Sequence, residues 1–204
     1  MDADLSQVTD EDLLSRCQRG SLEAFEEIYR RYQRPILAYI YQITRNYEEA
    51  GCIAQDVFLK VFEKVDRFDI ERRFSTWFYT IARNASIDYL QSRRRKVMVT
   101  FSDLDRNDGD NTILAVSEGK APSIVERLDR EEASELLRES LGKLPQIYRE
   151  IIELIVFQEL SYEQASEILG GVSLGTLRSR MFHALRHLRG SLQAIAGTDG
   201  ENVL

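Results

Sequence analysis

Residues 161–192 read SYEQASEILGGVSLGTLRSRMFHALRHLRGSL and contain two helical patterns separated by a pair of glycines. The first pattern includes acidic residues, whereas the segment from Thr176 to Leu192 contains no Asp or Glu. That segment carries four arginines, which are Arg178, Arg180, Arg186 and Arg189. Gly170 and Gly171 predict a tight turn that ends the first helix. An acid-free helix is unusual here, because the whole chain has a net charge of −7.

Capping residues predict where the two helices begin. Ser161 with Gln164 three positions later has the pattern of a capping box, and Ser173 predicts the start of the second helix. Apolar residues at helical spacing predict the faces that pack together. They are Ala165, Ile168 and Leu169 in the first helix, and Leu174, Leu177, Met181, Ala184, Leu185 and Leu188 in the second.

Two helices joined by a glycine turn favour a helix-turn-helix, in which the second helix enters the major groove of DNA. The residues expected to face outward on the N-terminal half of that helix are Thr176, Ser179, Arg180 and His183. Arginine pairs with guanine, and hydroxyl groups bind phosphates or base edges. Acids are excluded on this interpretation because they would face phosphate. The alternative is a solvated amphipathic helix whose arginines only maintain solubility.

The composition limits the class of protein. With 27 basic and 34 acidic residues in 204, the chain is not one that coats nucleic acid indiscriminately. Basic residues nevertheless cluster at 71–73, at 93–96 and in the last helix. No apolar run approaches the roughly 18 residues of a membrane span, and the acidic N-terminus is not a signal peptide. We therefore expect a cytoplasmic protein without membrane contact of its own, with Cys17 and Cys52 reduced and structural.

Helical patterns also fill the N-terminal half. Ser21 predicts one helix start and Pro35 the start of a second helix, which Asn46 ends. An amphipathic helix follows over residues 50–65. A further helix, with Ser75 as its cap, runs into the basic residues 93–96.

Residues 66–96 interleave arginines with aromatic residues. The set comprises Arg67, Phe68, Arg72, Arg73, Phe74, Trp77, Phe78, Tyr79 and Arg83, followed by the basic run 93–96. Such a mixture suits single-stranded nucleic acid, because bases stack on rings and phosphates pair with cations. The alternative is that the rings fill the core of a helical bundle. That alternative is favoured for Phe78 and Trp77 and evenly balanced for Phe68 and Phe74.

The predicted fold is all-α, with two small helical modules joined by a flexible acidic linker. Residues 97–120 contain five acids and two bases, a net charge of −3, with glycines interspersed. A short strand over 97–101 is the one weak β signal. The expected boundaries are a lead over 1–19, a first module over 20–96, a linker over 97–121, a second module over 122–192 and a tail over 193–204.

No pattern of residues indicates an enzyme. The carboxylates are not paired with a nucleophile or a phosphate-binding glycine loop. His183 and His187 are four positions apart, but no third ligand with suitable spacing accompanies them. We therefore expect no catalytic residue, no metal and no cofactor.

Four segments, in order, resemble the extracytoplasmic function (ECF) sigma factors of bacterial RNA polymerase. GSLEAFEEIYRRYQRPI and EEAGCIAQDVFLKVFEKVDRFD are similar to sigma region 2, and RRFSTWFYTIARNASIDYLQSRRRK to its −10 element reader. LPQIYREIIELIVFQELSYEQASEILGGVSLGTLRSRMFHALRHLR is similar to region 4, which reads the −35 element. The resemblance covers nearly the whole chain.

The resemblance implies a role for each segment. Region 2 would bind the β′ clamp of core RNA polymerase through Glu49, Gln55, Asp56, Phe58 and Leu59. It would melt and read the −10 element through Arg67, Phe68, Arg72, Arg73, Phe74, Trp77, Arg83 and Asn84. Region 4 would bind the β flap and read the −35 element through Ser173, Thr176, Arg178, Ser179, Arg180 and His183. The implied partners are core RNA polymerase, promoter DNA and an anti-sigma factor.

The sequence departs from the family pattern at a few positions. Gly51 and Cys52 stand where the family usually has acids, and His183 and Leu185 where arginines are common. The turn LGGVSLGT is one residue longer than usual. Two other functions stay open: a conventional helix-turn-helix regulator that binds duplex DNA alone, and a protein that uses sigma-like modules to sequester a partner.

Overall fold

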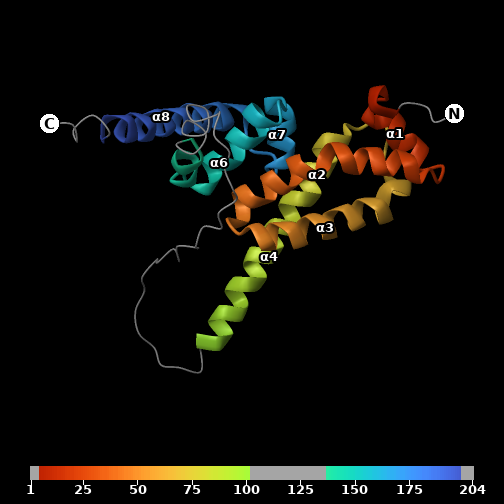
Figure 1. The fold of residues 1–204 in the computed structure, drawn as a ribbon, viewed down its shortest axis with the longest axis horizontal. Coiled ribbons are helices and arrows are strands. Elements are labelled where there is room, and N and C mark those ends of the chain that lie inside the picture. Colours follow the sequence, from red (N-terminus) through yellow and green to blue (C-terminus); the bar gives the residue numbers. More distant parts are fainter. Residues whose placement is uncertain (1–4, 102–136, 199–204) are drawn as a thin grey trace, which may run out of the picture. The chain divides into compact units, whose positions relative to one another are not determined.

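The computed structural model describes residues 5–101 and 137–198, and within these ranges every regular element is a helix (Figure 1). The all-α prediction is therefore confirmed. The chain forms two compact units. None of the described helices is long and apolar enough to cross a membrane.

The N-terminal unit is a bundle of four α-helices with two short 3-10 turns. In chain order the elements are η1 (Leu5–Gln7), α1 (Asp10–Cys17), α2 (Leu22–Thr44), α3 (Tyr47–Lys64), η2 (Val65–Arg67) and α4 (Phe74–Phe101). Side chains cap three of the helices, and the predicted cap Ser21 accepts a hydrogen bond from the Ala24 N–H at 3.3 Å. Asn46 caps α3 through the Glu49 N–H at 3.1 Å. Pairing these end groups fixes where each helix begins.

Helix α2 is continuous through Pro35, so the predicted break before this residue is wrong. Proline removes one backbone N–H and has a φ close to the helical value. The residues around it, Ile28, Ile36 and Ile40, are fully buried against the other helices of the unit. Their packing on both sides of Pro35 outweighs one missing hydrogen bond. Two other local predictions are also wrong: α4 begins at Phe74, one residue before the predicted cap Ser75, and residues 97–101 are helical rather than a strand.

Helix α1 packs against α2 although the sequence suggested an uninformative lead over residues 1–19. Leu13 and Leu14 are completely buried, and Cys17 is 8% exposed. Burial raises the pKa of the Cys17 thiol to about 11, so this thiol stays protonated at neutral pH. The N-terminal unit therefore starts well before residue 20.

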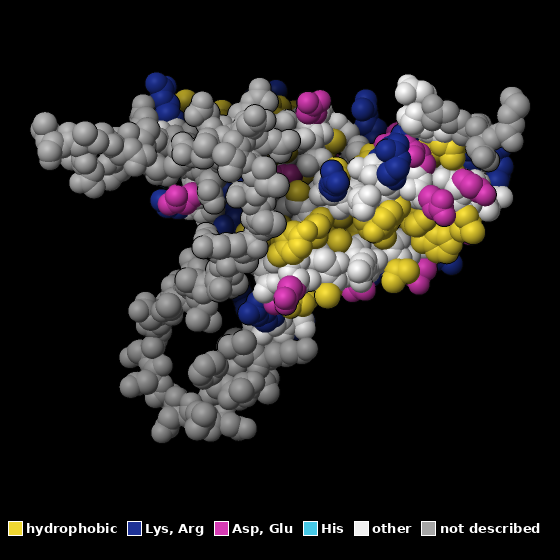
Figure 2. All heavy atoms as spheres, in the orientation of Figure 1, with side chains coloured by type: hydrophobic (Ala, Val, Ile, Leu, Met, Phe, Trp, Pro, Cys, Tyr) yellow, Lys and Arg dark blue, Asp and Glu magenta, His cyan; other side chains and the backbone are white. Residues whose placement is uncertain are grey.

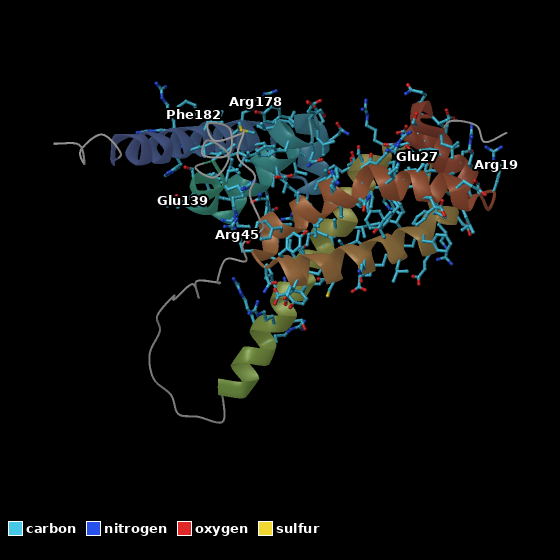
Figure 3. The ribbon with its side chains drawn as sticks, viewed as in Figure 1. Arg19, Glu27, Arg45, Glu139, Arg178 and Phe182 are labelled. Carbon is cyan, nitrogen blue, oxygen red and sulfur yellow. The ribbon has the colours of Figure 1, made fainter. Side chains whose placement is uncertain are left out.

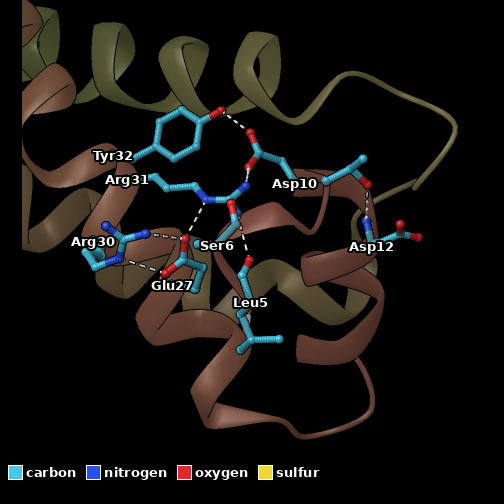
Figure 4. A network of polar contacts seen from close by, with 9 residues as sticks. Leu5, Ser6, Asp10, Asp12, Glu27, Arg30, Arg31 and Tyr32 are labelled. Carbon is cyan, nitrogen blue, oxygen red and sulfur yellow. Dashed lines mark hydrogen bonds and ion pairs between the residues drawn. The ribbon is translucent and has the colours of Figure 1, made fainter. Parts of the chain in front are cut away.

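A polar cluster attaches the start of the chain to α2 (Figure 4). The Arg31 guanidinium lies 2.7 Å from carboxylate oxygens of both Asp10 and Glu27, and it also donates to the Leu5 carbonyl. The Tyr32 hydroxyl donates to Asp10 at 2.5 Å. We call these residues, together with Arg30, which also pairs with Glu27, the N-terminal clamp. It holds η1 and α1 by charge-assisted hydrogen bonds.

The clamp predicts a pH dependence of stability. Hydrogen bonds from Arg30 and Arg31 lower the pKa of Glu27 from 4.5 to about 2. A carboxyl group with a lowered pKa stabilises the fold above its ordinary pKa and loses that contribution as the pH falls towards its folded-state pKa. We expect Glu27→Gln to be less stable than wild type at neutral pH, with the difference shrinking between pH 4.5 and about 2.

Urea unfolding followed through Trp77, the one tryptophan of the chain, measures this difference. The matched control is Glu26→Gln, a change at the exposed neighbouring position. It should not alter the pH profile. A difference between wild type and Glu27→Gln that stayed constant down to about pH 2 would contradict the role assigned to the ion pairs.

Gly51 lies inside α3, and a Cβ added there would meet nothing within 4 Å. Alanine is favoured over glycine in a helix interior by about 0.5–1 kcal/mol. We expect Gly51→Ala to raise the free energy of unfolding by that amount, measured by urea unfolding. The control is Gly20→Ala, where φ is +88° and a side chain is strained, so stability should fall. If the free energy of unfolding of Gly51→Ala were unchanged or lower, the conclusion that a side chain fits freely at this helix position would be wrong.

The C-terminal unit contains the predicted helix-turn-helix. After a helix end over 137–142, its elements are α6 (Gln146–Ile152), the π-helical turn η3 (Glu153–Phe157), α7 (Tyr162–Ile168) and α8 (Leu174–Thr198). The first part of the predicted second module, residues 122–136, and the acidic linker beyond Phe101 lie outside the described residues. Helix α6 packs against α8, where the Tyr148 and His187 rings stack with centroids 5.7 Å apart.

The predicted caps and turn of this unit are confirmed. Ser161 and Gln164 exchange two hydrogen bonds, at 2.9 and 3.2 Å. Ser173 caps α8 by accepting from the Thr176 N–H at 3.1 Å. Gly170 and Gly171 have φ values of +84° and +81°, which glycine adopts without strain. One predicted packing residue is wrong: Leu185 is 49% exposed, because the buried stripe of α8 runs through Leu177, Met181 and Ala184 instead.

Candidate nucleic-acid and polymerase-binding surfaces

An apolar surface runs along α2 and α3 of the N-terminal unit (Figure 2). We define the α2–α3 apolar surface as Leu22, Phe25, Tyr29, Leu59 and Phe62. Leu22 and Leu59 are each 60% exposed, and the Phe25 and Phe62 rings meet edge to face with centroids 4.9 Å apart. Contiguous exposed apolar side chains of this kind mark binding surfaces for other proteins.

The residues predicted to bind polymerase divide into two groups. Gln55, Asp56 and Leu59 are exposed on α3; Leu59 belongs to the α2–α3 apolar surface, and Gln55 and Asp56 are the polar residues beside it. Phe58 is only 6% exposed, because its ring packs against Tyr29 and Phe78. Phe58 therefore supports the surface from below.

Glu49 stands apart from this group. Its side chain is 18% exposed, and its carboxylate forms an ion pair with Arg93 of α4 at 2.9 Å. The family resemblance implied that Glu49 belongs to the docking face. The structure instead directs its carboxylate to a neighbouring helix of the same unit.

The predicted −10 residues lie at the end of η2, in the loop that follows it and along α4. Arg67, Arg72 and Arg73 are exposed, whereas Phe68 is 7% exposed and Phe74 is completely buried. Trp77 is half-buried, and its ring lies 4.7 Å from that of Phe68, centroid to centroid. The structure thus brings a layer of aromatic rings beneath a loop that carries arginines.

The side chain of Gln18 holds this loop in place, a role that the sequence did not predict. Its side-chain amide donates to the carbonyl oxygens of Val65 and Phe68, both at 2.8 Å. These contacts join the residue after α1 to a loop nearly fifty positions later. No local pattern signals such a pairing. On α4, Arg83 is half-buried and Asn84 is exposed one turn beyond the aromatic residues.

The predicted −35 residues lie in the N-terminal half of α8, with Ser173 as its cap. Thr176, Arg178, Ser179 and His183 are exposed, and Arg180 is half-buried. The Arg178 guanidinium lies over the Tyr162 ring of α7, 5.8 Å from its centroid. Ser173 combines two roles, because its hydroxyl caps α8 and also lies 2.8 Å from the Thr176 hydroxyl. Figure 3 shows Arg178 in this unit.

Phe182 belongs to the same surface and was missed. It is 64% exposed, and its ring meets that of His183 edge to face at 5.6 Å. The helical pattern could have predicted that Phe182 is exposed, because it lies between the packing residue Met181 and the outward-facing His183. An exposed aromatic ring beside arginines supplies apolar contact for a thymine methyl group. Figure 3 marks its position.

Comparison with known proteins identifies both units. Residues 28–96 match Sigma-70 region 2, and residues 134–188 match Sigma-70, region 4. The chain is 33% identical over 167 residues to RNA polymerase sigma factor YlaC of Bacillus subtilis strain 168, covering 82% of this chain and 91% of the relative. It is 29% identical over 180 residues to ECF RNA polymerase sigma factor SigW of the same organism, covering 88% and 95%.

The chain belongs to the ECF sigma factors. A solved structure agrees, that of the sigma factor RpoE in complex with the anti-sigma factor NepR from Bartonella quintana. It has a TM-score of 0.59 and 26% identity, and covers 84% of this chain and 98% of that one. Members of this family are non-catalytic transcription initiation factors. A conventional helix-turn-helix regulator leaves residues 28–96 unexplained, whereas the sigma family accounts for both units of this chain.

Proposed function

We propose that this sigma factor binds core RNA polymerase in the cytoplasm and directs initiation at promoters whose −10 and −35 elements it reads. The observation that carries the proposal is the pairing of a region 2 unit and a region 4 unit in one chain, each exposing its own arginines. A factor with two separate readers recognises a promoter only when both elements are present at the right spacing.

The α2–α3 apolar surface, with Gln55 and Asp56 at its edge, is the docking face for the β′ clamp. Its exposed Leu and Phe side chains supply the desolvation energy of an interface core, and the polar pair supplies the rim. The region 4 unit has its own exposed apolar residues, Val156 and Phe157, at the end of the π-helical turn η3. These are suited to the second polymerase contact, with the β flap.

The −10 element is captured by the loop after η2 and the start of α4. Opening of duplex DNA is stabilised when an unpaired base is held by stacking and its phosphates by cations. The half-buried Trp77 offers a ring, and Arg67, Arg72 and Arg73 offer exposed charges around it. Phe68 and Phe74 form the rigid floor of this site rather than the stacking partners, because both are buried.

The −35 element is read by the N-terminal half of α8 in the major groove. Arg178, Ser179 and His183 supply side chains for base edges and phosphates, and the capped end of α8 faces the backbone. The absence of acids from Thr176 onward keeps repulsion of phosphate low.

An anti-sigma factor is the expected inhibitor. The related RpoE structure contains the anti-sigma factor NepR bound to the sigma factor. In this chain an inhibitor that covered Leu59 and Phe62 would mask the docking face and compete with polymerase. Competition is therefore the expected mode of inhibition.

Selection of promoter fragments by the reconstituted holoenzyme tests the proposal. Core polymerase with this chain is mixed with a pool of random-sequence duplexes, and the retained fragments are sequenced. We expect two short conserved elements at a fixed spacing, absent from fragments retained by core polymerase alone. Retention of a single palindrome by the chain without polymerase would instead identify a duplex-binding regulator.

A further inference from the structure

Helix α4 leaves the bundle near Arg93. Its first half is anchored by Phe78, Ala82 and Ser86, each completely buried. From Arg93 onward its side chains are exposed as far as they are described, to Arg95. In Figure 1 the end of α4 extends past α3, away from the rest of the N-terminal unit. The direction of this basic end therefore depends on its last contacts with the bundle.

Glu49 makes those contacts from α3. Arg93 Nη1 lies 2.9 and 3.2 Å from the two carboxylate oxygens of Glu49. The Tyr89 hydroxyl, one turn earlier on α4, also bonds to Glu49, and this bond raises the pKa of Tyr89. One carboxylate thus holds two residues of α4. The Glu49 backbone is itself fixed, because its N–H donates to the cap Asn46.

The positive charges at the end of α4 indicate which function the Glu49 contacts serve. Arg94 and Arg95 are exposed, and within the described residues no ion pair involves either of them. Glu49 neutralises Arg93 alone and leaves the next two positive charges to solvent. These arginines follow Arg93 by only about 1.5 Å of helix rise per residue, so fixing Arg93 fixes them too. Exposed arginines on a rigid helix suit the phosphates of duplex DNA.

We propose that Glu49 is a positioning residue for promoter DNA rather than a polymerase contact: with Tyr89 and Arg93 it sets the direction in which α4 presents Arg94 and Arg95 to the duplex. The inference rests on the proposed sigma function.

Two measurements on the reconstituted holoenzyme test the assignment. One is the affinity for core polymerase, from competition with labelled wild-type chain, and the other is opening of the −10 region, from permanganate reactivity. We expect Glu49→Gln and Arg93→Gln each to lower opening by about 3–5-fold, the size of a partly exposed ion pair. Core affinity should not change. Opening of the −10 region by the double variant should equal that of either single variant, because each single change already removes the same contact.

A charge reversal and a neighbour serve as controls. Glu49→Arg combined with Arg93→Glu should recover opening relative to either reversal alone. Glu48→Gln, at the exposed adjacent position, should leave both measurements unchanged. Loss of opening in Arg93→Gln but not in Glu49→Gln would overturn the proposal, because Arg93 would then contact DNA directly. Loss of core affinity in Glu49→Gln would also overturn it. If the wild-type chain binds no core polymerase, the sigma function itself fails, which is a separate result.

Discussion

Replacing Leu59 and Phe62 together by Asp should lower the affinity for core RNA polymerase by about 100–1000-fold. Each side chain is about half exposed or more in the free protein, at 60% and 47%, so each has surface left to bury in a complex. Burial of a large apolar side chain contributes about 1.5–3 kcal/mol, and an aspartate in its place adds an unpaired charge to the interface. The change removes the centre of the proposed docking face.

Ile70→Asp is the matched control for this prediction. Ile70 is 49% exposed, close to the value for Phe62, but it lies in the loop that carries the −10 arginines. Its replacement should leave core affinity unchanged. Circular dichroism of the double variant should match wild type, because neither replaced side chain is buried. Wild-type core affinity in Leu59→Asp/Phe62→Asp would place the polymerase interface elsewhere.

The second large effect is expected at the −35 element. Arg178→Ala should lower the affinity of the holoenzyme for a promoter containing its −35 element by about 10–100-fold, and barely alter binding to a promoter with that element scrambled. An arginine paired bidentately with a base contributes about 1–3 kcal/mol of discrimination. In this chain Arg178 is exposed near the start of α8 and already oriented over Tyr162.

Arg186→Ala controls for the loss of positive charge alone. Arg186 is exposed two turns further along α8, outside the half expected to enter the groove. It should change affinity for both promoters slightly and equally. Equal losses on both promoters in Arg178→Ala would show that this arginine binds phosphate without reading sequence.

Local signals in the sequence predicted much of the fold. Ser21, Ser161 and Ser173 cap helices as expected, since a cap depends only on residues three positions away. Gly170 and Gly171 were predicted to end α7 because glycine adopts positive φ values without strain, which is also a property of the residues themselves. These features were predictable because the partners of each group lie close in the chain.

Contacts between distant residues were not predictable in this way. Helix α2 continues through Pro35 because packing against other helices outweighs a local break signal. The N-terminal clamp joins Asp10 to Arg31, and an ion pair between α3 and α4 joins Glu49 to Arg93, 44 positions away. A helical period shows which residues share a face, but not which neighbouring helix will cover them.

The same limit applied to the candidate site. Thr176, Ser179, Arg180 and His183 were predicted because the buried stripe of a single helix defines its outer face, whereas Arg178 was implied only by the family resemblance. The aromatic residues of the −10 loop were ambiguous, and the structure places Phe68 and Phe74 inside the core. The Gln18 side chain, just after α1, donates to the Phe68 carbonyl in that loop, a contact between distant residues that no local pattern predicts.

Run-off transcription with purified core polymerase tests the central claim most directly. A set of fragments carrying the −10 and −35 elements found by holoenzyme selection is transcribed with and without this chain. The sigma assignment predicts defined transcripts that appear only when the chain is present and vanish when either element is scrambled. The absence of transcripts, together with the absence of a complex between the chain and core polymerase, would contradict it.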